Sequence, residues 1–111
     1  MLETAESKFA IAAVREACAL IRAVQQSLVT QALTKSDRSP VTVADFAAQA
    51  IIARRFAEER PGDVLVGEED AGDLRSADSR ATLEQVTRFV GERAPGATAD
   101  AVCTWIDRGR A

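Results

Sequence analysis

The sequence contains no histidine and no tyrosine, and its only aromatic residues are one tryptophan and four phenylalanines. Without histidine, neither a histidine metal site nor histidine acid–base chemistry is possible. So few aromatic side chains also argue against a surface on which nucleic-acid bases stack. The net charge of −3 and the pI near 5.0 exclude a general electrostatic attraction to nucleic acid or to anionic membranes.

Cysteine and long apolar runs are scarce as well. Cys18 and Cys103 lie far apart and match neither a zinc-binding nor a redox spacing. Cys18 falls within an apolar helical pattern, which predicts a reduced packing residue. Arg15 and Arg22 interrupt the longest candidate for a membrane span, and the N-terminus lacks the basic region and cleavage site of a signal peptide. These absences favour a soluble cytoplasmic protein.

Helical periodicity, in contrast, is abundant. The 111 residues, 47% of them hydrophobic, fit one small globular domain. Hydrophobic spacing and helix-ending signals predict four helices, over residues 6–33, 43–60, 80–90 and from Thr98 onward. Gly91 is expected to end the third helix, and residues 94–96 to form a turn. We expect residues 34–40 to be a polar linker and residues 71–79 to be a loop with room for one helical turn.

The first two predicted helices have wide apolar faces. In the first, one face follows alternating steps of three and four and is apolar except at Gln25: Ile11, Val14, Cys18, Ile21, Gln25, Leu28 and Ala32. The second is apolar over much of its circumference, which is typical of a helix buried in something larger. Thr42, after an extended Val41, is its predicted N-cap, and Asp45 completes a variant of the capping box. We expect the two helices to pack together and to leave an apolar patch exposed.

A strand is predicted at Val64–Val66, where three β-prone aliphatic residues adjoin, and Gly67 ends it. Glu68, Glu69 and Asp70 follow at once. Three adjacent anions repel one another unless water or a cation separates them. The strand therefore delivers carboxylates to one point, as in an oxygen-ligand site for a hard cation such as Mg²⁺. A solvated acidic turn explains the same residues, and this stretch alone leaves both interpretations open.

Asp45 is the second acidic position of interest. In the first turn of a helix, an acid can simply interact favourably with the positive helix end. However, a helix followed directly by a strand can bring Asp45 and Glu68 to the same end of a sheet. Carboxylates so placed bind Mg²⁺ and orient a water molecule, which the metal acidifies for attack on phosphorus. We therefore predict that the two carboxyl groups lie on one side of the fold, within about 10 Å of each other.

Two motifs resemble the N-terminal part of the inositol monophosphatase superfamily, whose members are Mg²⁺-dependent, lithium-sensitive phosphomonoesterases. They are Ser-Pro-Val-Thr-Val-Ala-Asp-Phe at 39–46 and Val-Gly-Glu-Glu-Asp at 66–70. Within the superfamily the sequence is most similar to the 3'(2'),5'-bisphosphate nucleotidase branch. That similarity rests on Ser-Pro-Val-Thr, on Ala-Ala-Gln at 47–49 and on Trp-Ile-Asp-Arg-Gly at 105–109.

The resemblance implies roles for individual residues. Glu68 would be a ligand of Mg²⁺, the only cofactor implied, and Asp45 would orient or deprotonate the attacking water. Lys35 and Asp37 would lie in a loop that closes over the metals, and the role of Glu69 stays open. The implied substrate is adenosine 3',5'-bisphosphate, which loses its 3'-phosphate, or a related small phosphate ester. Neither a nucleic-acid polymer nor a membrane is an expected partner.

One departure from the family pattern limits these expectations. The motif Asp-Pro-Ile/Leu-Asp-Gly-Thr, which supplies two metal-binding aspartates and a threonine, is absent, as is the substrate-binding C-terminal half. The single predicted strand also lacks a partner for its backbone groups. We therefore expect residues 1–111 to be the incomplete N-terminal portion of one metal-dependent phosphatase domain. This portion should be mostly α-helical with one or few short strands, inside an α/β protein of the layered sugar-phosphatase type, and inactive alone.

Two other functions stay open at this point. The first is inositol monophosphatase-type activity on a sugar or inositol phosphate. The second is a small non-catalytic helical interaction module whose acids are helix caps and solvated turns. A phosphate-binding loop is excluded, because Glu68 and Glu69 stand where such a loop needs Lys and Ser or Thr.

Overall fold

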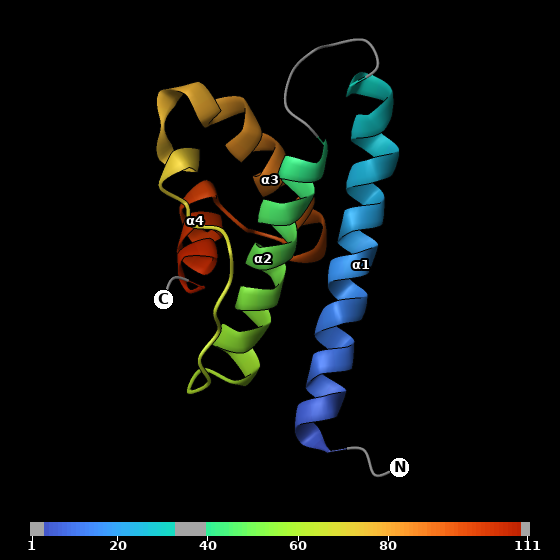
Figure 1. Cartoon of the computed structure of the whole chain (residues 1–111), viewed down its shortest axis with the longest axis vertical. Helices are drawn as coiled ribbons and strands as arrows, with labels where there is room; N and C mark the ends of the chain where they lie inside the picture. The colour runs from blue at the N-terminus through green and yellow to red at the C-terminus, as the bar shows by residue number, and fades with distance from the viewer. Residues whose placement is uncertain (1–3, 33–39, 110–111) are drawn as a thin grey trace.

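Four helices make up most of the computed structural model, which describes residues 4–32 and 40–109. They are α1 (Ala5–Ala32), α2 (Pro40–Glu59), α3 (Arg80–Arg93) and α4 (Ala99–Asp107), and two short 3-10 turns, η1 (Asp73–Arg75) and η2 (Ala77–Ser79), precede α3. Figure 1 shows α1 and α2 side by side, with α3 and α4 on the other side of α2. The predicted packing of the first two helices is confirmed, and the described part of the chain contains no strand.

α2 is the central helix because it carries small and apolar side chains on most of its faces. Its buried residues are Val43, Ala44, Phe46, Ala47, Ala50, Ile51 and Ala53. Four of the seven are alanines, which let α1, α3 and α4 all approach the same helix closely. α3 and α4 complete the core with Val86, Phe89, Val90, Val102, Cys103 and Ile106. None of the described helices combines the length and the apolar composition needed to cross a membrane.

The predicted core face of α1 is wrong at four positions, because Ile11, Val14, Cys18 and Gln25 are exposed, whereas Ile21 packs against the core as predicted. The side chains of Leu28 and Ala32 lie outside the described residues. Among the described side chains of α1, the buried ones are Ala13, Ala17, Leu20 and Val24. Ile11 and Val14, assigned to the core face above, are 46% and 56% exposed. Cys18 is also exposed, so it is not the packing residue that the pattern predicted. The helix has two adjacent apolar stripes, and the stripe with alanines faces α2 because it permits the closer approach of the two backbones.

α2 begins earlier than predicted. The helix starts at Pro40, and proline is favoured at a first helical position because its missing N–H and fixed φ fit there. Val41 is therefore helical rather than extended, and Thr42 lies inside the first turn, where it cannot be the N-cap. Asp45 falls in the second turn, beyond the range of a capping box.

The strand predicted at Val64–Val66 is absent, since no partner strand exists among the described residues to form a ladder. Residues 64–71 are called the acidic segment below. Their exposure to solvent nevertheless alternates from one residue to the next, with the period of two that is typical of a strand. Even-numbered residues are exposed, with Val64 at 85% and Val66 at 69%. Odd-numbered residues are half-buried or buried against the helices. The alternation of exposure typical of a strand is thus present, but the segment bends at Glu68 and is not a strand.

The C-terminal half is close to expectation, with one correction. α3 continues through Gly91 to Arg93, so Gly91 does not end it. The turn at residues 94–96 is present, and Gly96 has a φ of 89°, a conformation that glycine adopts readily. Thr98 is the N-cap of α4 as predicted, because its hydroxyl accepts a hydrogen bond of 3.1 Å from the Ala101 N–H.

Candidate functional site

The acidic segment is fixed to α2 by one side chain, that of Gln49. Its Nε2 donates to the backbone oxygen of Glu69 at 2.7 Å and to that of Ile106 at 2.8 Å. Its Oε1 accepts from the Glu69 N–H at 3.1 Å. The amide therefore makes with Glu69 the reciprocal pair of hydrogen bonds that a neighbouring β-strand would make. It also ties the segment to the last turn of α4.

The C-terminal end of α4 fastens the same segment at further points. The Gly67 N–H donates to the Gly109 oxygen at 2.8 Å. Asp107 accepts from the Ala71 N–H at 2.8 Å through Oδ1, and from Arg75 at 2.7 Å through Oδ2. In Figure 1 the yellow chain that carries the acids runs back from the end of α2 towards α4. The segment is thus bound on both sides although it belongs to no sheet.

Two glycines make room for this arrangement. A Cβ at Gly67 would overlap the Oε1 and Cδ of Gln49. A Cβ at Gly109 would lie 2.8 Å from the Gln49 Nε2 and 3.1 Å from the Gly67 nitrogen. A side chain at either position would have to displace the Gln49 amide from its hydrogen bonds. Neither glycine has a positive φ, so close approach and not backbone conformation favours glycine here.

The acids themselves form a region of high negative charge. Glu69 is half-buried, while Asp45, Glu68 and Asp70 are exposed. The pKa of the Glu69 carboxyl is raised, first by burial and then by the negative charges of Asp45, Glu68 and Asp70. The charges of α2 and of the acidic segment therefore act on one carboxyl group. The predicted separation of the Asp45 and Glu68 carboxyl groups stays a prediction.

The donor chemistry of this region fits Mg²⁺ in kind, because carboxylate oxygens are the ligands of hard cations. The number of ligands is smaller than a complete site needs. Among the described residues, no three or more carboxylates, cysteines or histidines are placed to hold one metal ion. Lys35 and Asp37, expected in a loop over the metals, lie outside the described residues. The described chain therefore offers at most part of a magnesium site.

Comparison with known proteins identifies relatives, although no protein-family model matches. A 3'(2'),5'-bisphosphate nucleotidase of Schizosaccharomyces pombe is 42% identical over 99 residues, which are 85% of this chain and 28% of that protein. 3'(2'),5'-Bisphosphate nucleotidase 1 of Arabidopsis thaliana is 42% identical over 79 residues, 68% of this chain and 22% of that protein. Probable 3'(2'),5'-bisphosphate nucleotidase 3 of the same plant is 37% identical over 110 residues, 88% of this chain and 31% of that protein.

The chain is homologous to the N-terminal part of the 3'(2'),5'-bisphosphate nucleotidases. The resemblance inferred from the motifs at 39–46 and 66–70 is thereby confirmed, together with the resemblance to a phosphatase. The chain spans less than one third of the length of these three relatives.

Gln49 and Asp107 are the residues whose importance the sequence reasoning missed. Both lie in motifs that carried the resemblance to bisphosphate nucleotidases, yet neither was given a role. A signal was present for Gln49, which is the one polar residue between Phe46 and Ala53, in a helix that is otherwise apolar there. An amide in such a run must satisfy its hydrogen bonds inside the protein, which marks it as a contact to backbone.

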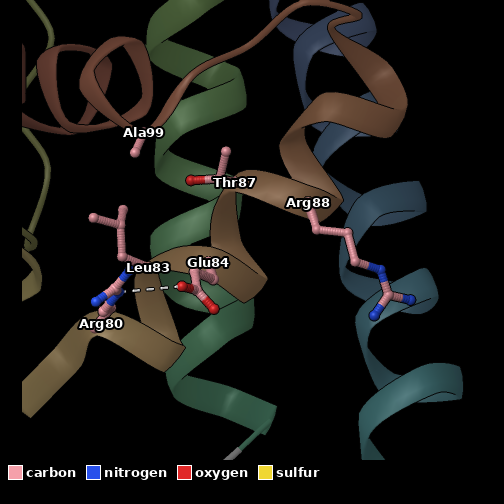
Figure 2. Close-up of a pocket in the computed structure, with 6 residues that line it drawn as sticks. All are labelled: Arg80, Leu83, Glu84, Thr87, Arg88 and Ala99. Carbon is pink, nitrogen blue, oxygen red and sulfur yellow. Dashed lines mark ion pairs between the residues drawn. The ribbon is translucent and has the colours of Figure 1, made fainter.

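A separate groove lies on α3 and the start of α4. It has a volume of about 480 Å³ and is lined by Arg80, Leu83, Glu84, Thr87, Arg88 and Ala99. Figure 2 shows these side chains along α3 and at the start of α4, with an ion pair of 3.4 Å between Arg80 and Glu84. No residue of the acidic segment lines this groove, so it is separate from the region that resembles the bisphosphate nucleotidases.

Proposed function

We propose that this chain is the N-terminal part of a Mg²⁺-dependent phosphomonoesterase that removes the 3'-phosphate of adenosine 3',5'-bisphosphate or of a related small phosphate ester. The relatives' names support the substrate class. The observation that carries the proposal is the acidic segment itself. α2 and the C-terminal end of α4 hold this segment by four hydrogen bonds. The charges of three further acids act on the half-buried carboxyl of Glu69.

The roles of the residues follow from their exposure. Glu68 is exposed beside the fixed backbone of Glu69, so its carboxylate is free to act as a metal ligand. Asp45 is exposed on α2, and its charge reaches the same Glu69 carboxyl, so it can accept a proton from a water molecule on this side. Bound Mg²⁺ would lower the pKa of its water and offset the charge of the phosphate.

The site needs residues beyond this chain to be active. Mg²⁺ requires near-octahedral oxygen geometry, and the described residues hold no group of three acids that could supply it. The two aspartates and the threonine of the missing motif would complete the ligands and the orientation of the water. We therefore expect the complete protein to be an α/β enzyme and the 111-residue chain to release no phosphate.

The test compares this chain with a version extended by the in-frame continuation of its coding sequence. Phosphate release from adenosine 3',5'-bisphosphate is measured with Mg²⁺, with and without lithium, and inositol 1-phosphate is the competing substrate. The extended protein should hydrolyse the bisphosphate, and Glu68→Gln should lower kcat by at least about a hundredfold. Glu92→Gln, an exposed acid of α3, is the matched control and should leave kcat unchanged.

Other results of this assay would change or contradict the proposed function. Preference for inositol 1-phosphate would reassign the substrate to the inositol phosphates. No hydrolysis by the extended protein, or turnover that Glu68→Gln does not change, would contradict the proposed function. In that case the acids are helix and turn residues of a non-catalytic module.

A further inference from the structure

Gln49 is a polar side chain of α2 that makes several hydrogen bonds to the acidic segment and to α4. Its amide uses both N–H groups and one lone pair on three backbone partners: the Glu69 oxygen, the Ile106 oxygen and the Glu69 N–H. The two atoms of the amide cannot exchange places, because Nε2 faces two carbonyl oxygens and Oε1 faces an N–H. Gln49 thus binds the backbone of the acidic segment at one defined residue, Glu69.

We propose that Gln49 is a positioning residue that sets the register of the acidic segment, so that Glu68 rather than Glu69 is presented to a cation. This inference rests on the proposed function. It adds a residue that touches neither metal nor substrate but decides which carboxylate does.

The register argument comes from the alternation of exposure. Exposed residues alternate with half-buried or buried ones along the acidic segment, so a slip of one residue would bring Glu68 to the half-buried place of Glu69. In a sheet, neighbouring strands prevent such a slip. Here the described residues contain no such strand, and the reciprocal hydrogen bonds between Gln49 and Glu69 perform that function.

Close packing makes this register selective. Gly67 and Gly109 leave just enough space for the Gln49 amide, and a Cβ at Gly67 would overlap it. A slip of one residue would bring Val66 or Glu68 to the place of Gly67. Either side chain has the Cβ that this place excludes, so the slipped register is opposed by contact as well as by lost hydrogen bonds.

Electrostatic repulsion gives the amide something to oppose. Glu68, Glu69 and Asp70 are consecutive acids, and their like charges repel one another. Gln49 holds the backbone of Glu69 in place against this repulsion. A cation bound by Glu68 would relieve it, which is why positioning and cation binding should be linked.

The test uses the ¹⁵N-labelled extended protein, in which the proposed function expects a complete magnesium site, and three variants. Gln49→Met keeps the size of the side chain and removes its hydrogen bonds. Gln49→Glu keeps the shape but sets a carboxylate against the oxygens of Glu69 and Ile106. Gln85→Met, at a half-buried position of α3, is the matched control. Amide hydrogen exchange at residues 67–71 reports the register, and the amide shifts of the same residues in a MgCl₂ titration report cation binding.

We expect Gln49→Met to speed exchange of the Glu69 amide by about tenfold or more. It should raise the MgCl₂ concentration at half-saturation by about tenfold, as loss of a group that orients a ligand does. Gln49→Glu should have the larger effect, while exchange in α1 and in Gln85→Met should match the wild type.

Two different failures are distinguishable. If residues 67–71 of the extended wild-type protein do not respond to MgCl₂, the proposed function is contradicted, and with it any role of Gln49 toward a cation. If the wild type responds but Gln49→Met has unchanged exchange at Glu69 or unchanged half-saturation, the proposed function stands and the positioning role of Gln49 is wrong.

Discussion

The pKa of the Glu69 carboxyl responds to its burial and to the negative charges around it in the acidic segment. Burial and three neighbouring acids raise its pKa in the folded chain above that in the unfolded chain. Below the ordinary glutamate value both states hold the proton, and Glu69 costs the fold nothing. As the pH rises from that value through the raised pKa, the folded state retains a proton that the unfolded state has lost, so stability falls.

The first prediction follows from this sign. Replacing Glu69 by Gln removes the penalty, so Glu69→Gln should raise the midpoint of thermal unfolding at pH 7 and leave it nearly unchanged at pH 3.5. Circular dichroism at a series of pH values measures both midpoints. Glu92→Gln provides the comparison, since it removes a charge from an exposed position of α3. An equal midpoint for Glu69→Gln and wild type at pH 7 would show that burial and the neighbouring acids do not raise the pKa of Glu69.

The second prediction concerns the glycine beneath the amide. Gly67→Ala should lower the free energy of unfolding by about 1–3 kcal/mol, because the added Cβ overlaps the Gln49 side chain. Gly62→Ala is the control, since a Cβ at Gly62 meets no atom within 4 Å. Denaturant unfolding measures both variants. In a Gln49→Ala background the cost of Gly67→Ala should shrink; an unchanged cost would mean that the two residues do not meet.

At the scale of single elements, the sequence predicted which helices exist better than it predicted their buried faces and their ends. The long apolar periodicity of α1 and the N-cap of α4 at Thr98 are local features of the sequence, so α1 and α4 were predictable. The buried face of α1 was not, because two adjacent apolar stripes exist and only the partner helix α2 selects the alanine-rich one. The acidic segment has the alternation of a strand, but whether it becomes one depends on a neighbour that its own residues cannot supply.

α3 gives the third prediction, because its end was misjudged. Gly91 lies inside the helix and a Cβ there meets no atom within 4 Å. Gly91→Ala should therefore stabilise the chain by about 0.5–1 kcal/mol, through the lower flexibility of the unfolded chain and the better helix propensity. Denaturant unfolding tests it. A loss of stability would show that Gly91 ends the helix after all.

At the scale of the whole molecule, α2 connects the core to the candidate site. One side of it packs on α1, and the others contact α3 and α4. Gln49 and Asp45 both stand on this rigid central helix, which is the kind of element that positions functional groups well. Asp45 and Glu68 were predictable as candidates from their motifs. An amide in an apolar run marked Gln49 as a backbone contact, but its partners, Glu69 and Ile106, were not predictable because they lie 20 and 57 residues away in the sequence.

The central claim is that Glu68 is a ligand of the catalytic cation. The most direct measurement is a crystal structure of the extended protein soaked with Mn²⁺, whose anomalous signal locates the ion without ambiguity. The account predicts a peak about 2.0–2.3 Å from a Glu68 carboxylate oxygen, with Asp45 on the same side and within reach of a metal-bound water. A peak bound only by other residues, or Asp45 and Glu68 on opposite faces, would contradict it.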